Sequence, residues 1–158
     1  MTDAREEQQP LPRLGQGFYW QDLEAGQQFR TFSRTITETD LVNFIGVTGM
    51  LEAIFIDATF DGGAIRGRPV PGALTYTIIE GFILQTMIQG TGLAMLELTQ
   101  KILKPVVVND TVHAVVTVTA IRPTSKASRA IVDSDVDVFN QHRERVMTYH
   151  AKRMLAGR

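Results

Sequence analysis

The longest apolar stretch of the sequence, residues 69 to 96, limits the possible folds more than any other feature. From Ala73 to about Gln89, the apolar residues leave hardly any polar face, as in a helix that other elements cover nearly all round. Glycines and polar side chains such as Glu80 and Gln85 interrupt the stretch, which argues against a membrane-spanning helix. The chain therefore needs a second layer of structure around this helix.

Four segments after the helix alternate between apolar and polar residues and could supply that layer. They are residues 92–103, 111–122, 129–140 and 143–155. A strand with one apolar face and one polar face is typical of an antiparallel sheet with one side exposed to water. With a first strand at residues 27–34, the pattern predicts an α+β fold in which an antiparallel sheet wraps around the long helix.

A short helix is predicted before the long one. Thr37 is followed three residues later by Asp40, a variant of the capping box, and apolar residues then recur at helical spacing until Gly46 and Gly49. Residues 50–68 lack a clear period, and we expect them to form an ordered segment that crosses the surface.

The composition indicates one domain and limits the kinds of partner. The 158 residues, 44% hydrophobic and 21% charged, are ordinary for one globular domain, expected over residues 16–158 after a loose, polar tail at 1–15. A net charge of -1 gives no field that would attract nucleic acid or an anionic membrane. The chain has no cysteine, and its three histidines lack the spacing of metal ligands, so no metal site is expected. The first twenty residues lack the pattern of a signal peptide, so a cytoplasmic location is expected.

Four sequence motifs occur in an order that suggests a known family. They are GFYWQDLEAGQQF (17–29), TITETDLVNFIGVTG (35–49), GRPVPGAL (67–74) and KPVVVNDTV (104–112). In this series the chain resembles the MaoC-like dehydratases, which include the (R)-specific enoyl-CoA hydratases. The resemblance implies a hot-dog fold, a homodimer, and an acyl-CoA held in a tunnel near the subunit interface, with CoA as part of the substrate rather than a separate cofactor.

The catalytic pair of that family is missing from this sequence. The family pattern Gly-Asp-x-Asn-Pro-x-His supplies an Asp and a His that activate water, whereas residues 49–55 read GMLEAIF. Met50 therefore stands at the Asp position and Phe55 at the His position, and neither can transfer a proton. Pro71 replaces a further His, but the next residue, Gly72, could still donate its backbone N–H to a thioester oxygen at the start of a helix.

Glu80 is the first candidate for a replacement catalytic group. It is the only charged residue between Arg68 and Glu97, and a carboxyl group desolvated among apolar neighbours is suited to general acid or base work. Its position eight residues after Gly72 is similar to that of the helix carboxylate in hot-dog thioesterases. The structural alternative is a buried ion pair with Arg66 or Arg68, or one across a dimer interface.

Several other residues are candidates for the site. Glu52 and Asp57 flank the missing pair and could reach the tunnel mouth, or they could be a surface acid and a cap or turn residue, respectively. Basic side chains could hold the CoA phosphates, although solvated basic turns would have the same composition. The expected substrate-binding residues are Met50, Phe55, Pro71, Tyr76, Lys104, Arg122 and Lys126.

Three functions follow from these candidates. The first, which the resemblance favours, is an acyl-CoA hydratase or dehydratase whose acid and base have moved to Glu80 or Glu52. The second is a thioesterase in which Glu80 activates water against a carbonyl held by the Gly72 N–H. The third is a non-catalytic subunit that binds the acyl thioester, with Met50 and Phe55 lining the acyl pocket.

Overall fold

The computed structural model of the chain describes residues 13–126 and 128–158, so most of the predicted tail lies outside the described part. In this part a short 3-10 helix precedes six strands and three α-helices. In chain order the elements are η1 (Trp20–Asp22), β1 (Gln28–Arg30), β2 (Arg34–Thr35), α1 (Glu38–Thr48), α2 (Ala53–Ile56), α3 (Gly72–Gln85), β3 (Gly92–Ile102), β4 (Thr111–Pro123), β5 (Arg129–Phe139) and β6 (Arg145–Ala156).

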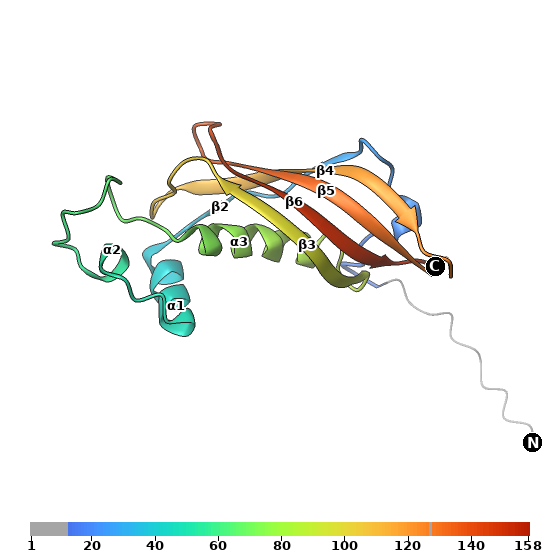
Figure 1. Cartoon of the computed structure of the whole chain (residues 1–158), viewed down its shortest axis with the longest axis horizontal. Coiled ribbons are helices and arrows are strands. Elements are labelled where there is room, and N and C mark those ends of the chain that lie inside the picture. Colours follow the sequence, from blue (N-terminus) through green and yellow to red (C-terminus); the bar gives the residue numbers. More distant parts are fainter. Residues whose placement is uncertain (1–12, 127) are drawn as a thin grey trace, which may run out of the picture.

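The long helix α3 lies along one face of a single antiparallel sheet (Figure 1). The strand order is β1-β4-β5-β6-β3, and β2 also pairs with β4. The predicted alternation is confirmed for β4, in which Val112, Ala114, Val116 and Val118 are all buried. Strand β3 was predicted with one buried face, but in the single chain it is exposed on both faces because no strand or helix of the described residues covers this edge of the sheet. Fully burying a side chain of this size contributes about 1.5–3 kcal/mol, so the core between helix and sheet supplies much of the driving force for folding.

Helix α3 is covered by the rest of the chain on most of its surface. Ile79 and Ile83 are almost completely buried, whereas Leu84 remains half exposed. The predicted end at about Gln89 is wrong, because the helix ends at Gln85. Thr86 leaves helical geometry there, and its hydroxyl donates to the Phe82 carbonyl. Within the described residues, no helix is long and apolar enough to cross a membrane.

The elements before α3 match the predictions in part. Thr37 caps α1 through a capping box with Asp40, and Gly49 ends the helix in the left-handed region at φ 72°. The predicted strand at residues 27–34 is split into β1 and β2, because the Thr31 hydroxyl accepts the Ala114 N–H and interrupts the ladder. The segment 50–68 was predicted without a helix but contains the short α2.

Candidate functional site

Two pockets lie along α3, at different positions on the helix. The first, called here the entrance pocket, has a volume of about 210 Å³ and lies at the N-terminus of α3, against the end of β3. The second, the Glu80 pocket, has a volume of about 330 Å³ and lies between the middle of α3 and the start of β3. The candidate site residues are divided between them.

The entrance pocket contains the first residue of α3. Gly72 follows Pro71, and no side chain caps this end of the helix. The N–H groups of the first helical turn carry a partial positive charge, so the site is suited to a carbonyl oxygen that gains negative charge. A Cβ atom at Gly72 would lie 2.3 Å from Ile102 Cδ1, so glycine lets β3 approach closely.

The walls of the entrance pocket are mostly apolar. Phe55, at the family's His position, is one of the lining residues, together with Ile54 and Ile102. The polar side chains that line it are Thr75 and Lys104. The Thr75 hydroxyl is fully buried and lacks a hydrogen-bond partner within the described chain. No carboxylate or imidazole belongs to this lining, so the described residues supply no obvious acid or base there.

The two acids that flank the missing catalytic pair stabilise local structure. Glu52 caps α2 by accepting the Ile54 N–H at 2.9 Å. Asp57 accepts the Thr59 hydroxyl and N–H, at 2.7 and 2.8 Å, and these hydrogen bonds lower the pKa of the Asp57 carboxyl. Asp57 does not line the entrance pocket but an adjoining cavity of about 410 Å³, and the two share Ile54, Ile65 and Pro69 in their linings. Met50 does not line the entrance pocket either.

Glu80 forms a buried ion pair, but not with the partners predicted from the sequence. Its Oε1 accepts Arg153 Nη2 at 2.5 Å and the Tyr149 hydroxyl at 2.7 Å. Arg68 instead pairs with Glu38, at 2.9 Å, so the predicted pairing with Arg66 or Arg68 is wrong. Buried charges are generally paired, and Arg153 compensates for the charge of Glu80.

Arg153 was not predicted as a site residue, although its position in the sequence carries a signal. Arg153 lies between Ala151 and Leu155 on the buried face of β6, a position where alternation calls for an apolar residue. Tyr149 lies on the same face, and burial and the neighbouring Glu80 raise the pKa of its hydroxyl. A charged residue on the apolar face of a predicted strand indicates a buried partner on the element that covers it.

The Gly72 N–H and the Glu80 carboxylate are not adjacent within one chain. Eight residues of helix at about 1.5 Å each place them roughly 12 Å apart along the axis of α3. Tyr76, one turn after Gly72, lines the Glu80 pocket rather than the entrance pocket. A reaction that needs both groups at one carbonyl would therefore require Glu80 from a second copy.

The predicted basic cluster for CoA phosphates is not formed within one chain. Lys104 lies beside the entrance pocket and pairs with Glu144 at 2.5 Å. Arg122 pairs with Asp133. The register of the sheet aligns Arg122 with Ala94, at the other end of β3. Lys126 is exposed in the turn that follows β4. Eight residues of strand separate Ala94 from Ile102, which corresponds to roughly 26 Å. The two groups lie at opposite ends of the sheet, so they cannot bind the same phosphate.

The histidines lie away from both pockets. His150 contacts Asp135 at 2.8 Å and Asp133 at 3.2 Å, and the hydrogen bond to Asp135 is the main reason that its pKa is raised. His113 stacks on Phe139, and partial burial lowers its pKa. In the described ranges, no group of three or more side chains could hold a metal ion.

Comparisons with known proteins find similar structures without a close relative in sequence. No protein-family model and no curated protein matches the chain. A MaoC-like dehydratase from Rhodospirillum rubrum superimposes with a TM-score of 0.80 at 23% identity, over 90% of this chain and 99% of that one. The unliganded R-hydratase PhaJ1 from Pseudomonas aeruginosa gives 0.77 at 25% identity, over 90% and 88%. A Mycobacterium tuberculosis protein with a double hot-dog fold gives 0.79 at 18% identity, over 93% and 46%.

These similarities confirm the predicted fold. The chain has an α+β hot-dog fold, with its antiparallel sheet packed around α3. The resemblance to MaoC-like dehydratases and R-hydratases is confirmed at the level of structure.

Proposed function

We propose that this chain, which has the hot-dog fold of the MaoC-like dehydratases, binds an acyl thioester such as an acyl-CoA and acts as a hydratase- or dehydratase-like protein. The observation that carries the proposal is the uncapped N-terminus of α3 at an apolar pocket. An apolar pocket with a few convergent polar groups is the usual form of a small-molecule site.

In this proposal the thioester carbonyl accepts a hydrogen bond from the Gly72 N–H. The dipole of α3 favours negative charge on that oxygen, which grows when a thioester is converted to an enolate. The buried Thr75 hydroxyl supplies a second donor, and Phe55 packs against the acyl chain. Lys104 lies at the same pocket, where its ammonium group can meet a phosphate of CoA.

Hydration of an enoyl thioester also needs proton transfer. A base must take a proton from water, and an acid must return one to the carbon next to the carbonyl. The lining of the entrance pocket offers neither, so this function requires Glu52 in another position, or Glu80 from a second copy.

A homodimer would bring such a second copy close. Strand β3 is at the edge of the sheet, and its exposed apolar side chains include Leu93, Met95 and Leu98. Antiparallel pairing of two β3 strands would satisfy the open edge and cover these side chains. The same contact is needed for a thioesterase that uses Glu80 of one copy and Gly72 of the other.

The second candidate is a non-catalytic acyl-thioester-binding subunit. It is favoured by Phe55, which lines the pocket where the family has a proton-transferring residue. In that case the chain would hold the thioester while a partner supplies the acid and base.

A panel of enoyl-CoA and saturated acyl-CoA substrates tests these functions. Loss of enoyl absorbance without thiol release would support a hydratase. Thiol release that disappears in Glu80→Gln would support a thioesterase. Acyl-CoA binding without either reaction would support the binding subunit, and the absence of binding would refute the proposal.

The role of the Gly72 N–H has a matched pair of variants. Gly72→Ala and Gly72→Pro both add a Cβ next to Ile102, whose exposed side chain can move, but only proline removes the N–H. Proline is well accepted at the first position of a helix, and Pro71 already has the extended backbone, φ -54° and ψ 135°, that is preferred before proline. We expect Gly72→Pro to bind acyl-CoA about tenfold more weakly than Gly72→Ala, measured by calorimetry. Equal affinities would remove the N–H from the proposal.

A further inference from the structure

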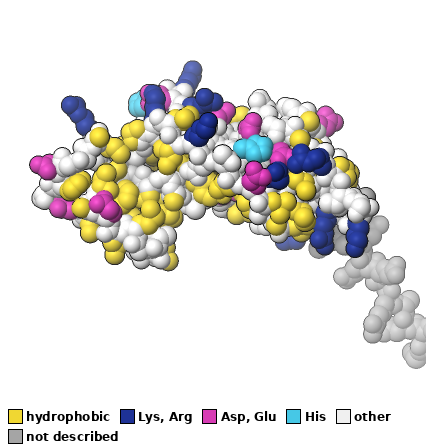
Figure 2. All heavy atoms as spheres, viewed as in Figure 1, with side chains coloured by type: hydrophobic (Ala, Val, Ile, Leu, Met, Phe, Trp, Pro, Cys, Tyr) yellow, Lys and Arg dark blue, Asp and Glu magenta, His cyan; other side chains and the backbone are white. Residues whose placement is uncertain are grey.

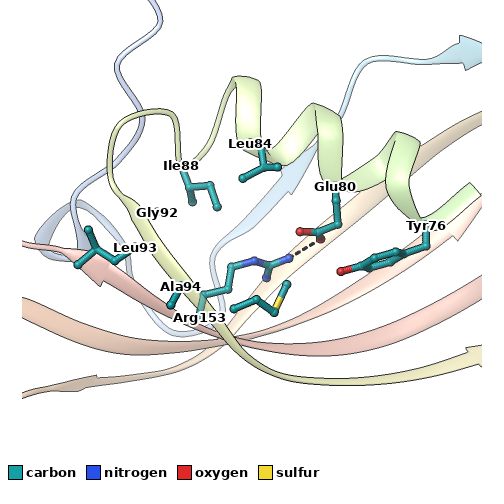
Figure 3. A pocket seen from close by; sticks show the side chains of 9 residues that line it. Tyr76, Glu80, Leu84, Ile88, Gly92, Leu93, Ala94 and Arg153 are labelled. Atoms are coloured by element: carbon teal, nitrogen blue, oxygen red, sulfur yellow. Dashed lines mark hydrogen bonds and ion pairs between the residues drawn. The ribbon is translucent and has the colours of Figure 1, made fainter. Parts of the chain in front are cut away.

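The Glu80 pocket has a polar group at its base and apolar walls (Figure 3). The side chains of Leu84, Ile88, Leu93 and Met95 form much of the wall. Tyr76, Glu80 and Arg153 supply the polar groups. A pocket of about 330 Å³ can hold part of an apolar chain and a single polar substituent.

One oxygen of Glu80 is available to a ligand. Arg153 and the Tyr149 hydroxyl both bond to Oε1, and the described residues make no hydrogen bond or ion pair to Oε2. Glu80 is only 8% exposed and lines the pocket. An unpaired carboxylate oxygen in a desolvated site is a strong acceptor, so it favours a ligand that donates a hydrogen bond.

Tyr76 supplies the complementary donor. Its ring lies in the pocket lining one turn from Glu80, with the hydroxyl directed toward the pocket (Figure 3). Burial, with the nearby Glu80, raises the pKa of this hydroxyl, so it keeps its proton at neutral pH. Tyr76 and Glu80 thus present one donor and one acceptor to the same space.

The charges at the pocket favour a neutral ligand. Arg153 donates to Glu80 and, at 2.8 Å, to Ser134, and compensates for the Glu80 charge. A cationic ligand would meet the guanidinium group, and an anionic one would meet the free Glu80 oxygen. The common neutral group that donates one hydrogen bond and accepts another is a hydroxyl.

We propose that the Glu80 pocket binds a hydroxyl group carried on an apolar chain, with the hydroxyl donating to Glu80 Oε2 and accepting from Tyr76. Glu80 lies roughly 12 Å along α3 from Gly72, a distance that an extended acyl chain can span. If that chain belongs to a thioester held at Gly72, which rests on the proposed function, the substrates are acyl thioesters that carry an additional hydroxyl group near the far end of the acyl chain.

Two isomeric ligands without CoA test the pocket by itself. 1-Octanol and 1-methoxyheptane have the same atoms, but only the alcohol can donate a hydrogen bond. We expect calorimetry to show at least about tenfold tighter binding of the alcohol to the full chain, as for a hydrogen bond to a charged acceptor. Equal binding of the two ligands, or binding of neither, would overturn the inference.

Variants locate the effect at Glu80 and Tyr76. In Glu80→Gln the amide oxygen can bond to Arg153 and Tyr149 while the NH₂ group faces the pocket, so the preference should shift toward the ether. Tyr76→Phe should weaken the alcohol severalfold but keep it preferred. Thr77→Val, a matched change on the exposed side of α3, should leave both affinities unchanged. If Glu80→Gln does not fold, the comparison of the ligands in the native chain and in Tyr76→Phe still decides.

A second arm separates this inference from the proposed function. Decanoyl-CoA and a decanoyl-CoA hydroxylated far from the thioester are titrated in parallel. Preference for the alcohol without binding of either CoA ester would support the pocket and refute thioester binding. Equal binding of the two CoA esters would support thioester binding and overturn the hydroxylated substrate class. Tighter binding of the hydroxylated ester supports both.

Discussion

Thr75 and Thr91 are buried threonines whose hydroxyl groups lack a hydrogen-bond partner within the described chain. An unpaired buried hydroxyl costs about 1–3 kcal/mol, so each of them lowers the stability of the free protein. Only Thr75 lines the entrance pocket, one turn from Gly72. A polar group that is costly in the free protein and placed at a pocket is suited to contact a ligand.

Replacement of Thr75 by valine should therefore separate stability from binding. We expect Thr75→Val to raise the free energy of unfolding by about 1 kcal/mol, because valine has nearly the same shape without the unpaired hydroxyl. Its affinity for an acyl-CoA should fall severalfold. Thr91→Val is the control, with a similar gain in stability and unchanged affinity. Urea unfolding and calorimetry measure the two quantities, and unchanged acyl-CoA affinity in Thr75→Val would exclude a binding role.

At the scale of residues, the sequence singled out Glu80 but not its partner. Glu80 stood out because a charge inside an apolar helix is rare, and the structure places it at a pocket. Its partner Arg153 lies 73 residues away in sequence. The sequence does not determine which residue of β6 lies opposite Glu80 of α3, because this depends on the register of the sheet. The separation of Lys104 from Arg122 has the same origin.

Among the elements, α1 depends strongly on its N-terminal cap. The Thr37 hydroxyl accepts the Asp40 N–H at 3.2 Å, and Asp40 accepts the Thr37 N–H at 2.8 Å. Only Leu41 and Ile45 of this helix are buried, so tertiary packing stabilises it less than it stabilises α3. The cap should matter correspondingly more.

Removal of the cap gives a quantitative test. We expect Thr37→Ala to lower the free energy of unfolding by about 1 kcal/mol, within the usual 0.5–2 kcal/mol for a lost N-cap. Thr39→Ala, at an exposed position in the first turn, should change it by less than about 0.5 kcal/mol. Chemical denaturation followed by circular dichroism measures both variants. A similar loss in the two would mean that the capping box does not stabilise α1.

The long regular elements were predictable, and the irregular ones were not. Periodicity located α3 and β3 to β6 to within a few residues. Helix α3 and strands β4 to β6 each bury one face, whereas β3 is exposed along nearly its whole length in the single chain. The break between β1 and β2 depends on the Thr31 hydroxyl and a backbone N–H of β4, a contact across 83 residues. The short α2 is capped locally by Glu52, and four residues are too few for a periodic signal.

At the scale of the molecule, strand β3 is the surface that one chain leaves incomplete. It pairs with β6 on one side only, and residues 92–99 are all exposed. Apolar side chains lie along it in the described structure, and hydrophobic atoms also gather on the face drawn in Figure 2. An exposed, long and apolar edge strand is rare in a monomer because it invites pairing with another chain.

A dimer through β3 should therefore be disrupted by a charge on that strand. We expect the native protein to sediment as a dimer of two 17.6 kDa chains. Leu98→Lys should raise the dissociation constant of this dimer at least about tenfold. Leu98 is 39% exposed in the single chain and would be covered in the dimer, so a lysine there would have to lose its hydration. Val47→Lys, at an 85% exposed position on α1, should remain dimeric. Analytical ultracentrifugation over a range of concentrations measures the dissociation constants. A dimer unaffected by Leu98→Lys would place the interface elsewhere. A monomeric native protein would confine any reaction to the residues of one chain, and within one chain Gly72 and Glu80 cannot act on the same carbonyl.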